Sequence, residues 1–354
     1  MIGYIETLEQ LRKTPKTWLV TGVAGFIGSN LLEALLKLDQ FVVGLDNFSS
    51  GHRHNLEQVQ RSVEGVQWNR FSLIEGDIRN LEDCQKSLYF RPSLADDRNN
   101  LGSKVDFVLH HAALASVPKS IEDPSATNEI NVTGFLNMLI AARDAGVGRF
   151  VYASSSAVYG DSPEAQKVEE QLGRCLSPYA LSKYINEVYA DLFFRTYRVE
   201  SIGLRYFNVF GRRQDPEGAY AAVIPKWIST MLKGQAVHVN GDGSTTRDFC
   251  FIDNIVQMNL LAATTTNSEA VNQIYNVGVG ESTSLNELYL YLSEFISSSM
   301  KLKVFPPVYR NFLEGDIRHS LANIQKATNF LKFKPEFGTQ EGLKSCIGGH
   351  IQGF

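Results

Sequence analysis

The sequence predicts an α/β protein built on a doubly wound parallel sheet, followed by a smaller C-terminal α/β lobe. Short, nearly continuous apolar runs alternate with helical stretches such as SNLLEALLKLD. Strands of this kind are typical of a parallel sheet that is covered by helices on both faces. Beyond residue 208 the alternation loosens, which indicates a second, smaller unit facing the sheet.

Six strands are expected in the first part of the chain. They cover residues 17–23, 40–47, 71–78, 105–113, 149–156 and 200–208. Such strands are joined by right-handed crossovers, and these sheets bind ligands beyond the carboxyl ends of their strands. Segment 91–104 is charged and contains proline and glycine, so we expect a surface loop there, inserted before the fourth strand.

The chain is expected to divide near residue 205. Residues 1–205 would form the sheet domain, with 1–16 as an N-terminal extension, and residues 206–354 would form the lobe, with segments that return to the sheet. Apolar residues recur at helical spacing in the extension, at Ile2, Ile5, Leu8 and Leu11. This pattern predicts a short helix lying on the body of the protein, and it is not that of a signal peptide or membrane span.

Composition narrows the classes of function. The 354 residues are 44% hydrophobic and 20% charged, with a net charge of -4. A net negative chain offers no general basic surface, so neither nucleic acid nor membrane is expected as a partner. The four cysteines lack both paired metal-ligand spacing and the density of a disulfide scaffold. We therefore expect reduced thiols, a cytoplasmic location and no metal site.

A glycine-rich turn follows the first strand. In TGVAGFIGSN, Gly22, Gly25 and Gly28 lie between that strand and a helix, where glycine lets the backbone approach a pyrophosphate and the helix N-terminus attracts its charge. Asp46 ends the second strand, downstream of this turn. A carboxylate there would accept hydrogen bonds from ribose hydroxyls and repel a 2′-phosphate. The pattern predicts NAD rather than NADP; the alternative is a glycine turn without a ligand.

Later strand ends contribute further candidate residues. Asp77 and Ile78 follow the third strand, and His111, Ala112 and Ala113 follow the fourth. His110 and His111 have no third ligand at suitable spacing, so we interpret them as packed or cofactor-lining residues.

A serine cluster and a tyrosine–lysine pair form the predicted catalytic site. The fifth strand ends in Ser154, Ser155 and Ser156, and Tyr179 precedes Lys183 by four residues after a Ser-Pro helix start. Residues four apart share one helix face. A phenol with a pKa near 10 is too weak a base at neutral pH, but an ammonium and a positive nicotinamide would both lower it. Alternatively, Tyr179 simply packs.

These motifs together resemble the extended short-chain dehydrogenase/reductase family over nearly the whole chain. The resembling segments are TGVAGFIGSN, LDNFSSGH, GDI, HHAALASV, SSSAVYG, YALSK, LRYFNVFG and RDFCFIDN. Within that family the chain is most similar to UDP-sugar 4-epimerases, particularly UDP-N-acetylglucosamine 4-epimerases of bacterial surface-polysaccharide pathways. The resemblance implies a Rossmann domain that binds NAD, a lobe that binds a nucleotide sugar, and a homodimer formed through two helices of each subunit.

The resemblance also assigns roles to residues. It implies Tyr179 as base, Lys183 as its electrostatic partner and Ser155 as the hydroxyl on the sugar 4-oxygen, with Ser156 as the alternative one position along. Beyond the glycine turn and the strand ends, it implies cofactor contacts at Phe26, Ile27, Asn47, Asn131 and Tyr206. It implies substrate contacts at Asn208, Ala222, Val223, Lys226, Trp227, Asn240, Arg247, Asp316 and Ser320. Alternatively, Trp227 belongs to the core, Lys226 is solvated, and Arg247 pairs with Asp248 or Asp253.

The implied reaction removes a hydride from sugar carbon 4 to tightly held NAD while Tyr179 takes the hydroxyl proton. The 4-keto sugar then turns over in the site and receives the hydride on its opposite face. Arg247 would bind the diphosphate through two hydrogen bonds.

Two positions bear on the substrate. Leu313 stands where similar epimerases carry a second diphosphate-binding arginine. Its loss would weaken binding by roughly 1.5–3 kcal/mol unless Arg310 or Arg318 substitutes. Ser320 stands where epimerases restricted to unacetylated sugars hold a tyrosine, so we expect UDP-GlcNAc and UDP-GalNAc to be preferred over UDP-glucose and UDP-galactose.

Other functions on this scaffold stay open. A 4,6-dehydratase would need an Asp-Glu pair where this chain has Ser156 and Ala157. A noncatalytic NAD-binding relative typically lacks the tyrosine or the lysine, and this chain has both. A UDP-uronate epimerase and a dehydrogenase that releases NADH are further alternatives.

Overall fold

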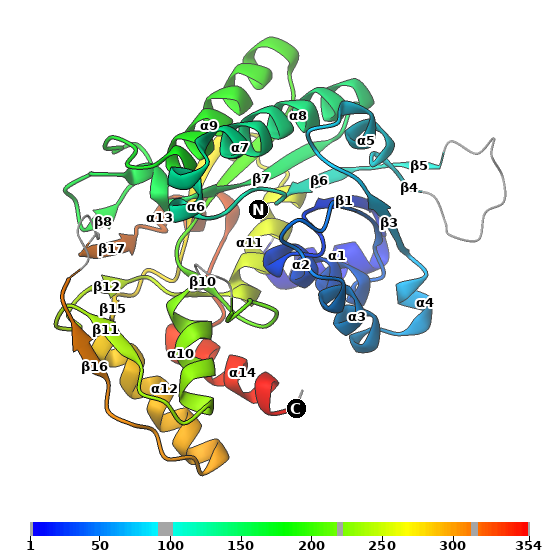
Figure 1. Ribbon diagram of the computed structural model, residues 1–354. Helices are drawn as coiled ribbons and strands as arrows, with labels where there is room; N and C mark the ends of the chain where they lie inside the picture. Colours follow the sequence, from blue (N-terminus) through cyan, green and yellow to red (C-terminus); the bar gives the residue numbers. More distant parts are fainter. Residues whose placement is uncertain (1–2, 91–101, 218–221, 313–317, 353–354) are drawn as a thin grey trace.

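The computed structural model describes residues 3–90, 102–217, 222–312 and 318–352, and its centre is a parallel sheet (Figure 1). The seven strands of this sheet lie in the order β14-β9-β7-β6-β1-β2-β3. Their bounds are β1 Thr17–Thr21, β2 Phe41–Asp46, β3 Phe71–Glu75, β6 Phe107–His110, β7 Arg149–Ser155, β9 Ser201–Tyr206 and β14 Gln273–Val277. All neighbours pair in parallel. The doubly wound fold and the six expected strands are confirmed.

The strand order reverses beside β1. The chain runs outward from β1 through β2 to β3, then returns to β6 on the opposite side of β1. Ligands of doubly wound sheets bind at such a reversal, beyond the carboxyl ends of the strands. This topology therefore locates the expected cofactor site.

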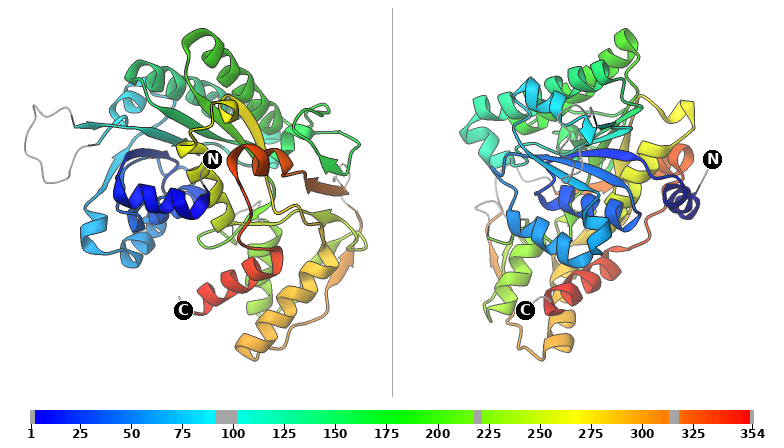
Figure 2. Two further views of the ribbon diagram at one scale, coloured as in Figure 1. Left: turned by 180° about the vertical axis from the view of Figure 1, so that it is seen from behind. Right: turned by 90° about the vertical axis from the view of Figure 1, so that its right-hand side faces the viewer.

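Helices cover both faces of the sheet, as Figure 2 shows. One layer contains α1 (Tyr4–Lys13), α2 (Phe26–Lys37), α3 (Arg53–Ser62), α4 (Gly65–Trp68) and α11 (Ile252–Thr264). The other contains α5 (Leu81–Lys86), α6 (Val117–Glu122), α7 (Pro124–Asn128), the π-helix η1 (Glu129–Thr133), α8 (Gly134–Ala145) and α9 (Pro178–Tyr197). Successive β1 residues pack into opposite cores, Trp18 and Val20 into one and Leu19 into the other, because side chains alternate across a strand.

The last two fifths of the chain build the lobe and also return to the main sheet. The lobe has helices α10 (Val223–Leu232), α12 (Leu285–Met300), α13 (Gln325–Leu331) and α14 (Thr339–Gln352). A four-stranded sheet joins β8 (Gln166–Lys167), β12 (Thr246–Arg247), β15 (Thr283–Ser284) and β17 (His319–Ala322). Two short pairs join β10 (Val209–Phe210) to β13 (Cys250–Phe251) and β11 (His238–Asn240) to β16 (Val308–Arg310). The boundary at residue 205 stays a prediction.

The remaining segments are short. Two 3₁₀ turns, η2 (Ser156–Tyr159) and η3 (Ser268–Ala270), follow β7 and α11. β4 (Tyr89–Phe90) and β5 (Ser103–Lys104) form an antiparallel pair, so the expected loop is strand-paired at its end, and residues 91–101 lie outside the described part of the chain. Helix α1 buries Leu11 against the core while Ile5 is 70% exposed. No helix in the described ranges is long and apolar enough to cross a membrane.

Candidate active site

A cavity of about 490 Å³ opens at the carboxyl ends of the central strands. Every residue expected to touch the cofactor lines it except Asn131: Gly22, Gly25, Phe26, Ile27, Gly28, Asp46, Asn47, Asp77, Ile78, His111, Ala112, Ala113, Tyr179, Lys183 and Tyr206. Positions that are far apart in the sequence, from Gly22 to Tyr206, thus converge on one site.

The glycine turn has the geometry that a dinucleotide requires. Gly22 has a φ of 69°, and a Cβ there would lie 2.9 Å from the backbone nitrogen of Ala112. A Cβ on Gly28 would lie 2.0 Å from the Gly22 carbonyl oxygen, so only glycine lets α2 approach β1 this closely. Gly25 is the N-cap of α2, whose free N–H groups therefore face the cavity.

Asp46 occupies the end of β2 as expected. Its carboxylate accepts hydrogen bonds from the backbone N–H of Ala24 (2.8 Å) and of Phe48 (2.8 Å). Burial raises the pKa of Asp46, and these two hydrogen bonds oppose the rise. The carboxylate thereby links the glycine turn to the loop after β2, where a ribose would lie in a dinucleotide bound along this edge.

Asn47 and Asp77 form the neighbouring wall. The Asn47 amide donates to Asp77 (2.8 Å), and Arg79 pairs with the same carboxylate (2.7 Å). The hydrogen bonds from Arg79 hold the pKa of Asp77 at about 2. An ionised carboxylate at this site again favours hydroxyl groups over a phosphate.

Asn131 lies behind the cavity wall. The Asn131 side chain accepts a hydrogen bond from Leu114 N–H (2.8 Å) and donates to the Leu114 carbonyl oxygen. The Asn131 amide also donates to the Ser182 hydroxyl (3.0 Å). Leu114 itself lines the cavity. Asn131 thus fixes a lining segment to α9, and its direct contact with the cofactor stays a prediction.

The sequence interpretation missed part of the lining. Ser49, Ser50 and Gly51 after β2, Ile130 on η1, and Gln214 also face the cavity. The serines stand in LDNFSSGH, so their place after Asp46 was a usable signal. Gln214 carried no such signal, because its loop reaches the site only through the tertiary fold.

The catalytic pair begins helix α9. The Ser177 hydroxyl accepts a hydrogen bond from Ala180 N–H (3.1 Å) and Pro178 occupies the first turn, which is how a Ser-Pro sequence starts a helix. Tyr179 and Lys183 follow on one face and both line the cavity. Tyr179 therefore borders a cavity, and its role as base stays a prediction.

The pKa of Tyr179 differs from the expectation. Burial raises it above the ordinary value of 10.0, and a hydrogen bond with the Ser155 hydroxyl opposes that rise. Lys183 was expected to lower it, but the lysine ammonium donates to the Ala153 carbonyl oxygen (3.0 Å). The expectation that the protein's own groups lower the pKa of Tyr179 is therefore wrong, because burial is the largest effect and raises it. Burial also lowers the pKa of Lys183 to about 8.

The three serines after β7 have different environments. All three line the cavity, but Ser154 is buried and donates to Glu187 (2.6 Å). Ser155 bonds Tyr179 and accepts from Ala157 N–H (3.1 Å). Of the two serines that the sequence left open, Ser155 is the one with a hydrogen bond to the tyrosine.

The two histidines are neutral packing groups. His110 bonds the Thr21 hydroxyl (3.0 Å), and His111 bonds the hydroxyl of Tyr206 (2.9 Å). Burial lowers the pKa of both, to about 3 for His111. In the described part of the chain no group of histidine, cysteine and acidic side chains could hold a metal ion.

A second cavity, of about 600 Å³, is lined by residues of the lobe between Asn208 and Arg310. Seven of the expected substrate residues line it: Asn208, Ala222, Val223, Lys226, Trp227, Asn240 and Arg247. Asn208 and Val209 line both cavities, so the two meet at the start of β10. Tyr179 and Ser155 belong to the first cavity, and Arg247 belongs to the second.

The alternatives for Trp227, Lys226 and Arg247 differ in outcome. Lys226 is exposed, as the solvated alternative expects, and it also lines the cavity. Trp227 is 4% exposed and belongs to the hydrophobic core. It also lines the cavity. The Asp253 carboxylate pairs with Arg212 (2.8 Å). Asp248 accepts from the backbone N–H of Val279, Gly280 and Ala322. One Arg247 nitrogen donates to the Thr246 carbonyl oxygen (2.9 Å).

The described residues that bear on the substrate differ in their place relative to this cavity, and Ser320 is not among the residues that line it. Ser320 on β17 is paired in register with Arg247 on β12 and is half-buried. Arg310 lines the second cavity, whereas the Arg318 guanidinium stacks on Phe312, 3.5 Å from the ring centre. Leu313 and Asp316 lie outside the described residues.

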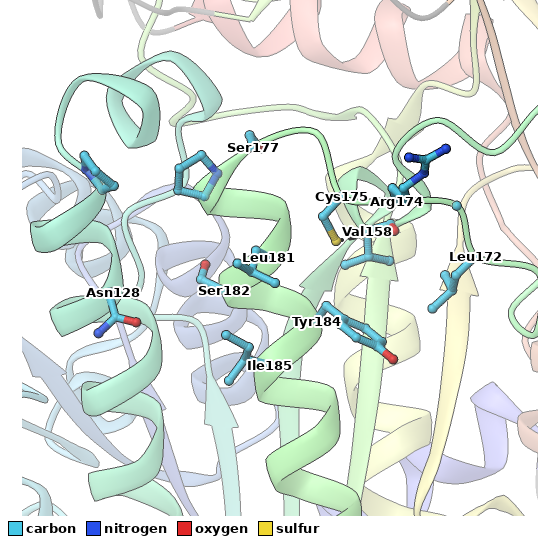
Figure 3. A pocket seen from close by; sticks show the side chains of 13 residues that line it. Asn128, Val158, Leu172, Arg174, Cys175, Ser177, Leu181, Ser182, Tyr184 and Ile185 are labelled. Atoms are coloured by element: carbon cyan, nitrogen blue, oxygen red, sulfur yellow. Dashed lines mark hydrogen bonds between the residues drawn. The ribbon is translucent and has the colours of Figure 1, made fainter.

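A third cavity, of about 670 Å³, is lined by residues of α9 that are not part of the cofactor cavity (Figure 3). Leu181, Tyr184 and Ile185 of α9 face Leu172 and Cys175 across it. Exposed apolar side chains continue along α9 at Val188 and Leu192. The helix that carries the catalytic pair therefore presents an apolar outer face.

The fold and site together define a dinucleotide-binding protein of the short-chain dehydrogenase/reductase class. The chain belongs to the NAD dependent epimerase/dehydratase family, whose model matches residues 18–278. The cofactor is accordingly NAD, and the glycine turn, the free N-terminus of α2 and Asp46 fit it.

Relatives with known names differ in their sugars. A putative UDP-glucose 4-epimerase of Methanocaldococcus jannaschii is 34% identical over 93% of this chain and 96% of its own length. A UDP-glucuronate 4-epimerase of Thermodesulfobacterium geofontis is 31% identical over 93% and 94%. The solved UDP-N-acetylglucosamine 4-epimerase of Methanobrevibacter ruminantium, in complex with UDP-N-acetylmuramic acid, has a TM-score of 0.82 and 34% identity, covering 96% of this chain and 99% of its own.

Proposed function

We propose that this chain interconverts a UDP-hexose and its C4 epimer, with UDP-GlcNAc and UDP-GalNAc as the preferred pair. The observation that carries the proposal is the junction of the two cavities at Asn208 and Val209. A UDP-sugar held by its nucleotide in the second cavity would extend its hexose into the first, toward Tyr179. The relatives above carry UDP-sugar 4-epimerase names.

The chain's own groups account for the proton chemistry. Tyr179 accepts the C4 hydroxyl proton and later returns it, and the Ser155 hydroxyl holds the same sugar oxygen. Bound NAD supplies the acceptor and then the donor of the hydride. Lys183, whose pKa burial lowers to about 8, holds this face of α9 to the Ala153 carbonyl oxygen, and the positive nicotinamide of bound NAD would favour the phenolate. The sugar leaves with no net oxidation.

The lobe's role is to hold the nucleotide while the sugar turns. Arg247 and Arg310 border the second cavity from β12 and β16, and their guanidinium groups suit a diphosphate. Arg310 is the substitute that we propose for the arginine replaced by Leu313. Rotation of the 4-keto sugar requires that the hexose itself be held less firmly than the UDP moiety.

The preference for acetylated sugars rests on Ser320. A serine at this position on β17 takes less space than the tyrosine of restricted epimerases, so an N-acetyl group has room. UDP-glucose/galactose or UDP-uronate epimerisation is the alternative, since named relatives act on such sugars. A dehydratase is disfavoured because Ser156 and Ala157 provide no acid, and a noncatalytic role is disfavoured by the intact Tyr179–Lys183 pair.

Purified protein incubated separately with UDP-GlcNAc, UDP-glucose and UDP-glucuronate tests the proposal. The 4-epimer should form from UDP-GlcNAc most rapidly, without added cofactor and without net NADH absorbance; chromatography of the sugars and the absorbance of NADH report this. Conversion of another sugar with a larger kcat/KM would overturn the substrate assignment. Stoichiometric NADH would indicate a dehydrogenase, and no product from any sugar would reject the enzyme.

We also propose a cytoplasmic homodimer that serves surface-polysaccharide synthesis. The exposed apolar side chains on the outer face of α9, together with Val117 and Ile121 on α6, support association through helices, as the family resemblance implies. Val188→Asp should convert the dimer into monomers in analytical ultracentrifugation, whereas the exposed control Asp144→Asn on α8 should not. A wild-type monomer would contradict the proposed dimer.

A further inference from the structure

A buried carboxylate lies one helical turn beyond the catalytic pair. Glu187 follows Lys183 by four residues on α9, so Tyr179, Lys183 and Glu187 share one face of the helix. Glu187 is 7% exposed and belongs neither to the cofactor cavity nor to the second cavity. The proposed reaction gives it no proton and no contact with the substrate.

Glu187 instead binds two strands that carry other parts of the site. One carboxylate oxygen accepts from the Ser154 hydroxyl (2.6 Å) and from Arg205 Nε (2.9 Å). The other accepts from Arg205 Nη2 (2.8 Å). Ser154 on β7 and Arg205 on β9 are paired in register, and the next pair in the same register is Ser155 with Tyr206. One side chain thus joins α9, β7 and β9 immediately behind the cavity.

Stability alone does not account for this arrangement. Arg205 is 2% exposed. Because desolvation is costly, a buried ion pair contributes little more to stability than well-packed apolar residues would. We therefore interpret the Glu187–Arg205 pair as a device that fixes the positions of the elements it joins. Here the geometry in question is the distance between two separate elements. Tyr179 lies on the helix and Ser155 on the strand, and the chain between them passes through η2, β8 and the loop that leads to α9.

The Arg205 side chain extends the connection away from the catalytic pair. Its Nη1 donates to the Glu169 carbonyl oxygen (2.8 Å). The Glu169 carboxylate accepts from Asn276 N–H (2.9 Å), and the Asn276 side chain donates to the Asn323 carbonyl oxygen (3.1 Å). The segment that follows β17 is therefore tied to the same buried network.

We propose that Glu187, acting through Ser154 and Arg205, is a positioning residue that sets the contact between Tyr179 and Ser155. It holds the base on α9 beside the hydroxyl on β7 in one cavity, so that both address the same sugar oxygen. This inference rests on the proposed epimerase function for its kinetic consequence. Its geometric consequence is measurable without any substrate.

Ser154→Ala removes the link between Glu187 and the serine strand without unpairing Arg205. We expect kcat to fall roughly 10- to 100-fold, as displacement of reacting groups by about 1 Å does, while KM, NAD content and melting temperature change little. Ser87→Ala is the matched control, because Ser87 is also buried and donates one hydrogen bond, to the Cys84 carbonyl oxygen, far from the site. This control should retain full turnover.

Titration of Tyr179 gives a readout that needs no turnover. The ultraviolet difference between each protein and its Tyr179→Phe derivative reports ionisation of this one phenol. The hydrogen bond from Ser155 lowers the pKa of Tyr179, so Ser154→Ala should raise it and Ser87→Ala should leave it unchanged. If the wild-type protein epimerises no sugar, the proposed function fails while this measurement still judges the positioning role.

The double variant Glu187→Leu/Arg205→Met separates positioning from stability. Replacing a buried pair by apolar side chains often leaves stability unchanged or increased. We expect the double variant to melt near the wild-type temperature and yet keep the low kcat of Ser154→Ala. Recovery of kcat together with stability would show a merely structural pair, and a wild-type kcat and Tyr179 titration in Ser154→Ala would equally overturn the proposal.

Discussion

The dinucleotide half and the nucleotide-sugar half of the site are built in different ways. The first cavity is formed at the ends of a single seven-stranded sheet, and its walls are mostly backbone turns such as the one at Gly22. The second is formed by helix α10 and by strands of two or three residues, and its polar walls include long side chains such as Arg247 and Arg310. Backbone geometry therefore shapes the first cavity, whereas long cationic side chains border the second.

The largest effect should come from the place where the halves meet. Tyr179→Phe removes the only proposed proton acceptor, so turnover should fall roughly 10²- to 10⁴-fold, while NAD stays bound because the glycine turn is untouched. Stopped assays of epimer formation and measurement of NAD released on denaturation check this.

Tyr189→Phe is the control on the same helix, since Tyr189 packs into the second core and faces no described cavity. Unchanged turnover in Tyr179→Phe would remove the base assignment, and loss of NAD would mean that the two halves are not separable.

A substrate-side arginine should affect binding and not chemistry. Arg310→Ala should raise KM roughly 10- to 150-fold, the equivalent of a charge-assisted contact worth about 1.5–3 kcal/mol. kcat and NAD content should stay near wild type. Steady-state kinetics with UDP-GlcNAc measures both constants.

Arg318→Ala provides the comparison, because Arg318 stacks on Phe312. A larger rise in KM for Arg318→Ala than for Arg310→Ala would reverse our choice of the arginine that compensates for Leu313.

Replacing Ser320 by a larger residue should affect acetylated sugars more than unacetylated ones. Ser320→Tyr should lower kcat/KM for UDP-GlcNAc by roughly 5- to 150-fold, since overfilling a packed site costs about 1–3 kcal/mol. UDP-glucose, which lacks the acetyl group, should be affected much less. Ser320→Ala is the control of unchanged size. An equal loss for both sugars would contradict the pocket-size argument.

The smallest effect on turnover is expected at Asp248. Burial raises the pKa of Asp248 to about 6, from an ordinary value near 3.9 when unfolded. Between these values the folded protein binds more protons than the unfolded chain, so the contribution of Asp248 to the free energy of unfolding falls as pH rises from about 4 to 6. The shift corresponds to roughly 3 kcal/mol.

Asp248→Asn cannot titrate, so its unfolding free energy should change less over that pH window. Urea unfolding at several pH values measures this, with the exposed Asp144→Asn as control. Parallel curves for Asp248→Asn and the wild-type protein would show that Asp248 does not titrate as described.

The contrast between the halves also explains what the sequence could predict. The glycine turn and Asp46 obey local rules, since a turn, a helix start and a strand end follow one another along the chain between Thr17 and Asp46, and they converge as expected. The seven expected substrate residues that line the second cavity came from the family resemblance, not from any local rule.

Tertiary features escaped prediction for physical reasons. A return of the lobe to the main sheet was expected, but β14 was not identified in advance, because nothing in QIYNV distinguishes a strand of the main sheet from one of the lobe. The Glu187–Arg205 pair was not singled out from the sequence, because residue spacing does not reveal that the fold buries both side chains. The raised pKa of Tyr179 likewise depends on burial, which residue spacing along α9 does not report.

Strand β14 comes late in the sequence, and this order has a consequence for folding during synthesis of the protein. β9 lies between β7 and β14, and β14 begins only at Gln273. While the ribosome is still making residues 207–272, the edge of β9 that faces away from β7 has no partner strand. Unpaired strand edges promote association between chains. A nascent chain paused in that interval should therefore need chaperone protection, and emergence of β14 from the ribosome should end that need.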